Sequence, residues 1–322
     1  MENVTKRFGK VVANNAINLE LREGEILSLL GENGSGKTTL MNMLSGIYFP
    51  DEGQIYIHGK PVTIASPKDA FNYGIGMIHQ HFKLVDVFTA TENIVLGLEG
   101  KLDLAEAGKK VKEICDKYGF DIDPNQKIYD MSVSQKQTVE IVKVLFRGAD
   151  ILILDEPTAV LTPQETDKLF QIMRNMKADG KSLIIITHKL HEVLDVSDRV
   201  AVLRKGEYIG DVATKDADQQ SLTDMMVGHS VSLNIDRPEP VNVTPRLVLD
   251  GLTVFDELGV KRLDNVSFTV NAGEVLGVTG LLGDGRSELF QAVFGDLPYT
   301  GQLFMEGQPV KETSTPQAIR LG

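Results

Sequence analysis

The residues best suited to chemistry stand in a glycine-rich segment that ends in Lys37 and Thr38. Backbone N–H groups with little Cβ bulk around them can converge on phosphate oxygens at the N-terminus of a helix. We therefore expect Lys37 to span the β- and γ-phosphates of a nucleotide and the Thr38 hydroxyl to bind Mg²⁺. The alternative interpretation is a glycine-rich surface turn. The residues predicted to contact nucleotide here are Gly31, Asn33, Gly34, Ser35, Gly36, Lys37, Thr38 and Thr39.

Two carboxylates and a histidine follow two further apolar runs. Asp155 and Glu156 come after residues 151–154, and His188 comes after residues 183–187. Continuous apolar runs are typical of strands buried on both faces, and the C-terminal ends of such strands meet ligands. We expect Asp155 to bind Mg²⁺ through water, Glu156 to orient or deprotonate the attacking water, and His188 to contact the γ-phosphate. The alternatives are an acidic turn and a structural, hydrogen-bonding histidine.

Strands and helices must bring these side chains together. An apolar strand is predicted over 26–30, and apolar residues recur at helical spacing directly behind the glycine-rich loop. The segment 162–165, Thr-Pro-Gln-Glu, is a capping box with proline at the first helical position, and it predicts the start of another helix. The predicted fold class is α/β, of the P-loop nucleotide-binding type.

Composition limits the class of protein further. The 322 residues are 42% hydrophobic and 24% charged, an ordinary globular mixture long enough for two domains. We find no run of apolar residues long enough to span a membrane. The single cysteine, Cys115, excludes an intramolecular disulfide framework. A formal charge of −12 argues against a broad nucleic-acid footprint.

The sequence of the N-terminal part of the chain is repeated near its C-terminal end. The segment that starts at Gly24 has a counterpart that starts at Gly273, and the match extends on both sides. A repeat of this length indicates two copies of one domain. The residues between the copies carry three prolines and no periodicity, so they are predicted to be a linker. The predicted organisation is a domain over 1–228 that lacks only its extreme N-terminus, a linker over 229–245, and a partial second copy over 246–322.

The second copy differs from the first in two respects. Gly322 corresponds to about Gly74, so only the front half is repeated, and we expect the chain to be a fragment of a longer protein. Arg286 replaces the lysine of the phosphate loop. A guanidinium is planar and larger than the ammonium that such a loop accommodates. We therefore expect weakened or altered nucleotide binding there.

Together these motifs resemble the ATP-binding subunit of an ABC transporter, over essentially the whole chain. The resemblance implies an ATPase fold with a mixed sheet core and a helical subdomain, ATP and Mg²⁺ as ligands, and a position on the cytoplasmic face of the membrane. It further implies that Gln80 senses Mg²⁺ and the attacking water, and that the segment 81–97 faces the membrane partner. Phe8 occupies the place of an aromatic residue that stacks on adenine, although by itself Phe8 reads as a core or edge residue.

The family signature, LSGGQ, takes an altered form here. The segment 131–135 reads Met-Ser-Val-Ser-Gln, which keeps Ser132 and Gln135 but loses both glycines. In the family these residues complete the γ-phosphate site of an opposing domain, so the added Cβ atoms make this signature degenerate. Most relatives also carry an aspartate where this chain has Thr162, and the capping box explains Thr162 without catalysis.

Within the family, the segments 74–85 and 88–94 look most similar to purine-nucleoside importers that work with lipoprotein receptors. The implied partners are transmembrane permease subunits and, indirectly, a lipoprotein or periplasmic-type solute receptor. A monosaccharide importer of the ribose or galactose type is the nearest alternative. Two others are a non-transport ABC ATPase of DNA repair or translation, and a module that binds ATP without hydrolysing it.

The resemblance also implies a head-to-tail arrangement, in which each nucleotide lies between the phosphate loop of one domain and the signature of the other. The first phosphate loop then needs the missing remainder of the second domain. We therefore expect this chain to bind Mg-ATP at Lys37 but to hydrolyse it slowly, because Glu156 lacks donors from across the dimer.

Overall fold

The computed structural model describes residues 1–80, 82–98, 100, 103–229, 243–256, 258–280, 283–310 and 314–321. Two compact units divide the chain, residues 1–233 and 234–322. Most of the predicted linker 229–245 lies outside the described residues, although strand β11 already begins at Pro245. Among the described residues, no helix has the length and apolar character needed to cross a membrane.

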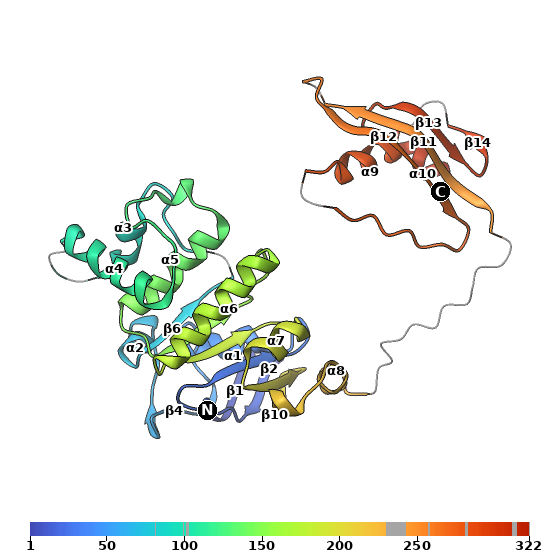
Figure 1. Cartoon of the computed structure of the whole chain (residues 1–322). Helices are drawn as coiled ribbons and strands as arrows, with labels where there is room; N and C mark the ends of the chain where they lie inside the picture. Colours follow the sequence, from blue (N-terminus) through green and yellow to red (C-terminus); the bar gives the residue numbers. More distant parts are fainter. Residues whose placement is uncertain are drawn as a thin grey trace. The chain divides into compact units, whose positions relative to one another are not determined.

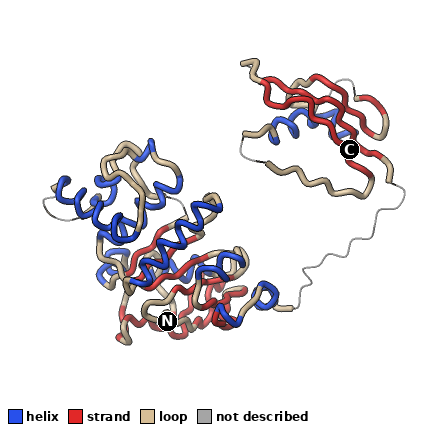
Figure 2. Tube along the Cα trace, viewed as in Figure 1, coloured by secondary structure: helices blue, strands red, loops and turns tan. Residues whose placement is uncertain are grey.

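A six-stranded sheet with the order β10-β9-β3-β8-β7-β6 forms the centre of the first unit (Figures 1 and 2). Five of its strands run parallel and only β10 pairs antiparallel, so the sheet is mixed, as predicted. Strands β3 and β8 are buried along their whole length, which explains their unbroken apolar sequences. The strands are β3 (Ile26–Leu30), β6 (Ile75–Ile78), β7 (Ile151–Asp155), β8 (Ser182–Ile186), β9 (Arg199–Arg204) and β10 (Glu207–Ala213).

A second, antiparallel sheet with the order β2-β1-β4-β5 packs on the central sheet. One hydrophobic core joins them: Val4, Ile17 and Ile55 from the second sheet are buried with Leu27 and Leu29 of β3. Helix α1, directly behind the phosphate loop, contributes Leu40, Met41 and Met43 to the same core. The elements are β1 (Glu2–Phe8), β2 (Val11–Ile17), β4 (Glu52–Ile57), β5 (Lys60–Val62) and α1 (Lys37–Leu44).

Helices α3, α4 and α5 gather at one end of the first unit and form the predicted helical subdomain (Figure 1). Their apolar faces share a core with α6 and with Leu152 and Leu154 of β7. Cys115 on α4 belongs to this core, and burial raises the pKa of its thiol to about 11. The helices of the first unit beyond α1 are α2 (Pro67–Asn72), α3 (Ala90–Val95), α4 (Leu104–Tyr118), α5 (Val133–Phe146), α6 (Pro163–Ala178), α7 (Leu190–Val196) and α8 (Gln219–Val227), with short 3-10 turns at Ile128–Asp130 and Thr214–Asp216.

The second unit repeats the smaller sheet of the first. Its strand order, β12-β11-β13-β14, corresponds to β2-β1-β4-β5, as the sequence repeat implies. Helix α9 takes the place of α1. The elements are β11 (Pro245–Phe255), β12 (Lys261–Asn271), β13 (Thr300–Met305), β14 (Gln308–Pro309), α9 (Arg286–Phe294) and α10 (Thr315–Leu321).

One repeated segment does not repeat its structure. Residues 274–280 match the sequence of β3 but form no strand, and Val275 is 83% exposed where its counterpart Ile26 is 1% exposed. Strand β3 lies between β8 and β9, and the described part of the second unit holds no equivalent of either. A sequence that is suited to a strand needs neighbours to satisfy its backbone hydrogen bonds, so this segment stays extended without pairing.

Candidate functional site

The glycine-rich loop joins the C-terminal end of β3 to the first residue of α1. Gly36 is the N-cap of α1 with φ of 98°, and no side chain caps the helix there. A Cβ at Gly36 would lie 2.4 Å from the carbonyl oxygen of Ala13, so the backbone of β2 leaves room only for glycine. The N–H groups of the first turn are therefore open to an anion, which is the geometry predicted for phosphate binding.

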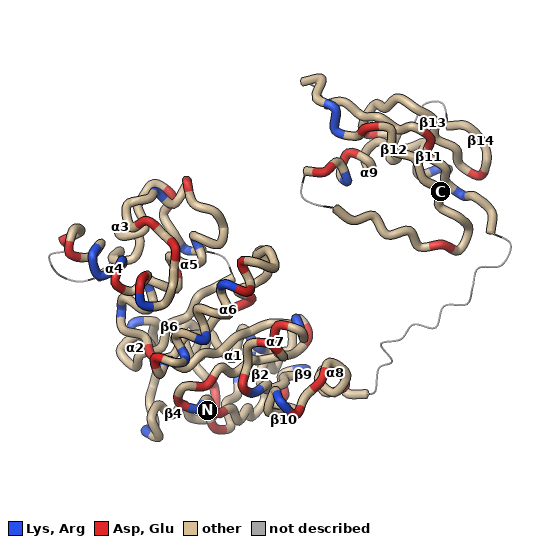
Figure 3. The backbone as a smooth tube through the Cα atoms, in the orientation of Figure 1, with Lys and Arg blue, Asp and Glu red and all other residues tan. Residues whose placement is uncertain are grey.

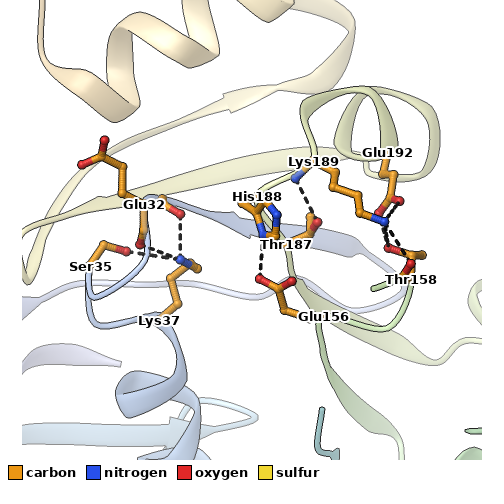
Figure 4. A network of polar contacts seen from close by, with 10 residues as sticks. Glu32, Ser35, Lys37, Glu156, Thr158, Thr187, His188, Lys189 and Glu192 are labelled. Carbon is orange, nitrogen blue, oxygen red and sulfur yellow. Dashed lines mark hydrogen bonds and ion pairs between the residues drawn. The ribbon is translucent and has the colours of Figure 1, made fainter. Parts of the chain in front are cut away.

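Lys37 is buried, and its Nζ lies within the loop. It donates hydrogen bonds to the carbonyl oxygens of Gly31 at 2.7 Å and Glu32 at 2.9 Å, with Ser35 Oγ at 3.5 Å (Figure 4). Burial lowers the pKa of Lys37, while the charges of Glu156 and Asp155 oppose that shift. The loop thus holds the ammonium at the start of α1.

Asp155 ends strand β7 beside the phosphate loop. Desolvation raises the pKa of Asp155, and the charge of Glu156 adds to the increase, while a hydrogen bond from the Thr38 side chain opposes it. Gln80, exposed just beyond the end of β6, lines the same cavity. Hydroxyl, carboxylate and amide oxygens are the ligands that Mg²⁺ prefers, usually with only one or two from protein carboxylates. The three predicted metal residues therefore suit that ion.

Glu156 and His188 are brought into contact although 32 positions separate them. His188 Nδ1 lies 2.8 Å from Glu156 Oε1 (Figure 4). Glu156 has φ of 50°, a left-handed conformation that non-glycine residues seldom adopt, and its N–H donates to the carbonyl oxygen of Ile186 at 2.9 Å. Backbone strain of this kind is typical of functional sites.

Behind Glu156, a polar network holds the turn that follows it (Figure 4). Thr158 Oγ1 donates to Glu192 Oε2 at 2.6 Å, and Lys189 Nζ donates to Glu192 Oε1 at 3.0 Å and to the Thr158 carbonyl oxygen at 2.9 Å. From helix α5, Gln137 Nε2 donates to the carbonyl oxygen of Pro157 at 2.7 Å. Helices α5 and α7 are thus both fastened to the turn that carries Glu156.

A single cavity of about 760 Å³ collects most of the predicted residues. Those that line it are Asn33, Gly34, Gly36, Lys37, Thr38, Thr39, Gln80, Asp155, Glu156 and His188. Gly31 and Ser35 contribute the oxygen atoms that hold Lys37.

Phe8 does not line this cavity. Its ring makes an edge contact with Tyr48, with centroids 5.2 Å apart, and Lys6 Nζ lies 5.6 Å from its centroid. Phe8 is 43% exposed, so the stacking on adenine stays a prediction.

The degenerate signature also lies away from the cavity lining. Ser132 caps helix α5 through a capping box with Gln135, and Ser132 Oγ lies 3.1 Å from Ser134 Oγ. Thr162 forms the predicted capping box with Glu165 at the start of α6.

In the second unit, Gly285 precedes α9 with φ of 95°, like Gly36 before α1. Arg286, however, has Nε 3.3 Å from Asp284 Oδ1, and Asp284 stands where the first loop has Ser35. Residues 281 and 282 of this second loop lie outside the described residues. The guanidinium has a different local partner from the ammonium of Lys37.

Six further lining residues were not foreseen from the sequence. They are Val11, Val12, Ala13, Ile186, Lys205 and Gly206. Val11 and Val12 are 65% and 43% exposed at the start of β2, an apolar surface beside the loop. Gly206 was a signal for a tight turn, although lysine is not among the residues favoured at the first position of a two-residue hairpin turn.

Comparison with known proteins places the whole chain among similar sequences. A family model described as "ABC transporter" matches residues 14–159 and 263–321. The chain is 50% identical to a nucleoside import ATP-binding protein of Lactococcus lactis over 301 residues, which is 92% of this chain and 59% of that protein. It is 47% identical to a guanosine import ATP-binding protein of Bacillus subtilis, over 99% of this chain and 63% of that protein. A ribose import ATP-binding protein of Rubrobacter xylanophilus is 41% identical, over 100% of this chain and 64% of that protein. The chain thus spans about three fifths of the length of these relatives.

Solved structures agree on the fold. An ATP-binding cassette of an ABC transporter in its ADP conformation superimposes with a TM-score of 0.62 at 25% identity, over 70% of this chain and 93% of that one. A dimeric bacterial ABC transporter cassette gives a TM-score of 0.58 at 27% identity, over 66% of this chain and 97% of that one.

Proposed function

Because this chain belongs to the ABC transporter family, we propose that its first unit binds ATP and hydrolyses it to drive the import of a small solute, with nucleosides the favoured class. The observation that carries the proposal is the single cavity in which the phosphate loop meets Asp155, Glu156 and His188. This combination of a phosphate-binding loop, paired carboxylates and a histidine suits phosphoryl transfer.

In the proposed mechanism, the N–H groups at the start of α1 and the Lys37 ammonium bind the phosphates. Thr38, Asp155 and Gln80 would hold Mg²⁺, which would neutralise charge on the phosphate oxygens. Glu156 accepts a proton from water as the water oxygen attacks the γ-phosphorus and the bond to the ADP oxygen breaks. The contact between Glu156 Oε1 and His188 leaves acceptor capacity on the carboxylate for that proton. His188 orients the carboxylate and contacts the γ-phosphate.

Phe8 is proposed to stack on adenine when nucleotide binds. Ser132 and Gln135 are proposed to serve a nucleotide on an opposing domain, because neither lines the cavity of their own unit. Turnover is proposed to need the signature of an opposing domain, because its N–H groups would supply donors for the transition state.

Nucleosides are proposed as the solute because two similar relatives are named for nucleoside and guanosine import. Monosaccharides are the second candidate, since a glucose import ATP-binding protein of Haloferax volcanii is 42% identical over 98% of this chain. Proposed partners are transmembrane permease subunits, contacted through the region that follows Gln80, and, indirectly, a solute receptor. The proposed location is the cytoplasmic face of the membrane.

Titration calorimetry with Mg-ATP tests the binding step. The parent chain is expected to bind, and Lys37→Ala to show no measurable binding, with Lys60→Ala as an exposed lysine control on β5. Equal affinity of the parent and Lys37→Ala would overturn the assignment of the site.

Uptake tests the solute. The chain should be co-purified with permease subunits encoded beside it and assayed in vesicles with labelled guanosine and labelled ribose. Guanosine uptake that depends on ATP supports the first candidate, ribose uptake supports the second, and failure to bind any permease overturns the transport role.

A further inference from the structure

Lys205 occupies an unusual backbone position beside the site. It forms with Gly206 the two-residue turn between β9 and β10, with φ of 51° at Lys205 and 81° at Gly206. Both central residues have positive φ, as in a type I′ hairpin turn, where asparagine, aspartate or glycine is favoured at the first position. A lysine there is strained, and strain that persists near a site is a reason to look for a function.

The turn is fastened to the phosphate loop. Gly206 N–H donates to the carbonyl oxygen of Ser35 at 3.1 Å, and Asn15 N–H donates to the carbonyl oxygen of Gly206 at 2.8 Å. A Cβ at Gly206 would lie 2.8 Å from the carbonyl oxygen of Ala13, so the turn is packed closely against β2. Its position relative to the loop is therefore fixed by backbone contacts, and the Lys205 side chain starts from a defined point.

Lys205 lines the same cavity as Lys37, yet the two ammonium groups differ in their contacts. Lys37 Nζ is held by carbonyl oxygens of its own loop. Within the described part of the chain, no hydrogen bond or ion pair engages Lys205, whose side chain is exposed. A cation with three donors thus lines a cavity that is proposed to receive a strongly anionic ligand.

We propose that Lys205 is a second cation for the phosphate chain of the nucleotide. The inference rests on the proposed function and adds a binding residue from a different element of the fold. The β9–β10 turn is tied to Ser35, in the part of the loop before Lys37, so the contact is expected to serve ATP and ADP alike. The interaction is solvent-exposed, and a loss of about fivefold in affinity is the expected size when it is removed.

Lys205→Asn is the decisive variant because it separates the charge of the side chain from the backbone conformation of the turn. Asparagine fits the left-handed turn better than lysine but carries no charge. The nucleotide-free variant is expected to melt at the same temperature as the parent or higher, while calorimetry shows Kd raised about fivefold for both Mg-ATP and ADP. Lys205→Arg, which keeps the charge, should stay within about twofold of the parent. Lys60→Ala removes an exposed lysine elsewhere and should leave Kd unchanged.

Three results would overturn this inference. The first is an affinity of Lys205→Asn for Mg-ATP and ADP that equals that of the parent chain, while Lys37→Ala no longer binds Mg-ATP. The second is an equal loss in Lys60→Ala, which would indicate a general effect of net charge. The third is a loss in Lys205→Arg as large as in Lys205→Asn, because it would exclude the charge as the cause. If the parent chain itself fails to bind Mg-ATP, the proposed function fails first, and that outcome is distinguished by the parent titration alone.

Discussion

Glu156 combines a strained backbone with a side chain that faces a histidine, and each property serves the proposed proton transfer. Glu156→Gln keeps the shape and removes the basic oxygen. We expect Mg-ATP affinity to be retained and phosphate release by the assembled transporter to fall by at least about 100-fold. Phosphate release and nucleotide titration on the same preparation provide the measurement. Glu113→Gln, on the exposed face of α4, is the matched control, and transport that survives in Glu156→Gln would contradict the role of the base.

Asp155 offers a prediction about pH, because burial and the charge of Glu156 raise the pKa of its carboxyl. A carboxyl whose pKa is raised by folding favours the native state most when protonated, so its contribution is present at low pH and is lost as pH rises through the folded-state pKa. Asp155→Asn should therefore raise the melting temperature of the nucleotide-free chain at neutral pH, with a gain that shrinks on acidification. Thermal melting from pH 7 to pH 4 measures this gain. A lower melting temperature of Asp155→Asn at neutral pH would contradict this account, because it would show that the Asp155 carboxylate stabilises the native state.

The placement of the principal site residues could be predicted because each follows an uninterrupted apolar run. Asp155 ends β7, His188 follows β8, and Lys37 begins α1 behind the loop that follows β3. Parallel strands deliver such residues to one edge of the sheet. Lys205 and Val12 could not be found this way, since they reach the cavity through hairpins whose position beside the loop depends on long-range packing. The sequence carries no periodic signal for that packing.

At the scale of elements, the turn after β7 depends on the network that α7 supplies. Glu192 is 4% exposed and accepts hydrogen bonds from both Thr158 and Lys189. Glu192→Ala leaves the Thr158 hydroxyl without its acceptor and removes the carboxylate that faces the Lys189 ammonium, and we expect a loss of about 3 kcal/mol in the free energy of unfolding. Urea denaturation measures it. Glu192→Gln, which keeps one acceptor oxygen, should lose less, and equal losses in the two variants would contradict the hydrogen-bond account.

Two elements show which structures depend on local sequence alone and which depend on distant parts of the chain. The capping box at Thr162 forms as predicted because all its partners lie within one helical turn. Residues 274–280 carry nearly the same sequence pattern as β3 and form no strand, because a strand is defined by neighbours that lie far away in the sequence. The mixed sheet and the helical subdomain were foreseen from the family resemblance rather than from the propensity of single segments.

At the scale of the whole molecule, each unit has a hydrophobic core of its own, and the core cluster of the second is small, with six buried side chains among the described residues. Calorimetry should therefore show two unfolding transitions. Mg-ATP at 100 times its Kd should stabilise only the first unit, by about 2.7 kcal/mol. The Lys37→Ala variant supplies the control. If both transitions shift in the parent chain, the loop at Arg286 also binds nucleotide, contrary to our expectation.

Lys and Arg are interspersed with Asp and Glu along the backbone of both units, over the residues that the structure describes (Figure 3).

The unpaired segment 274–280 has a practical consequence for anyone who handles this protein. The segment exposes three apolar side chains, those of Val275, Leu276 and Val278. Its unpaired main-chain groups can form hydrogen bonds with a strand of a neighbouring molecule. Concentrated samples should therefore aggregate over time, and light scattering measures this. A charged substitution in the segment, Val275→Lys, should reduce the aggregation.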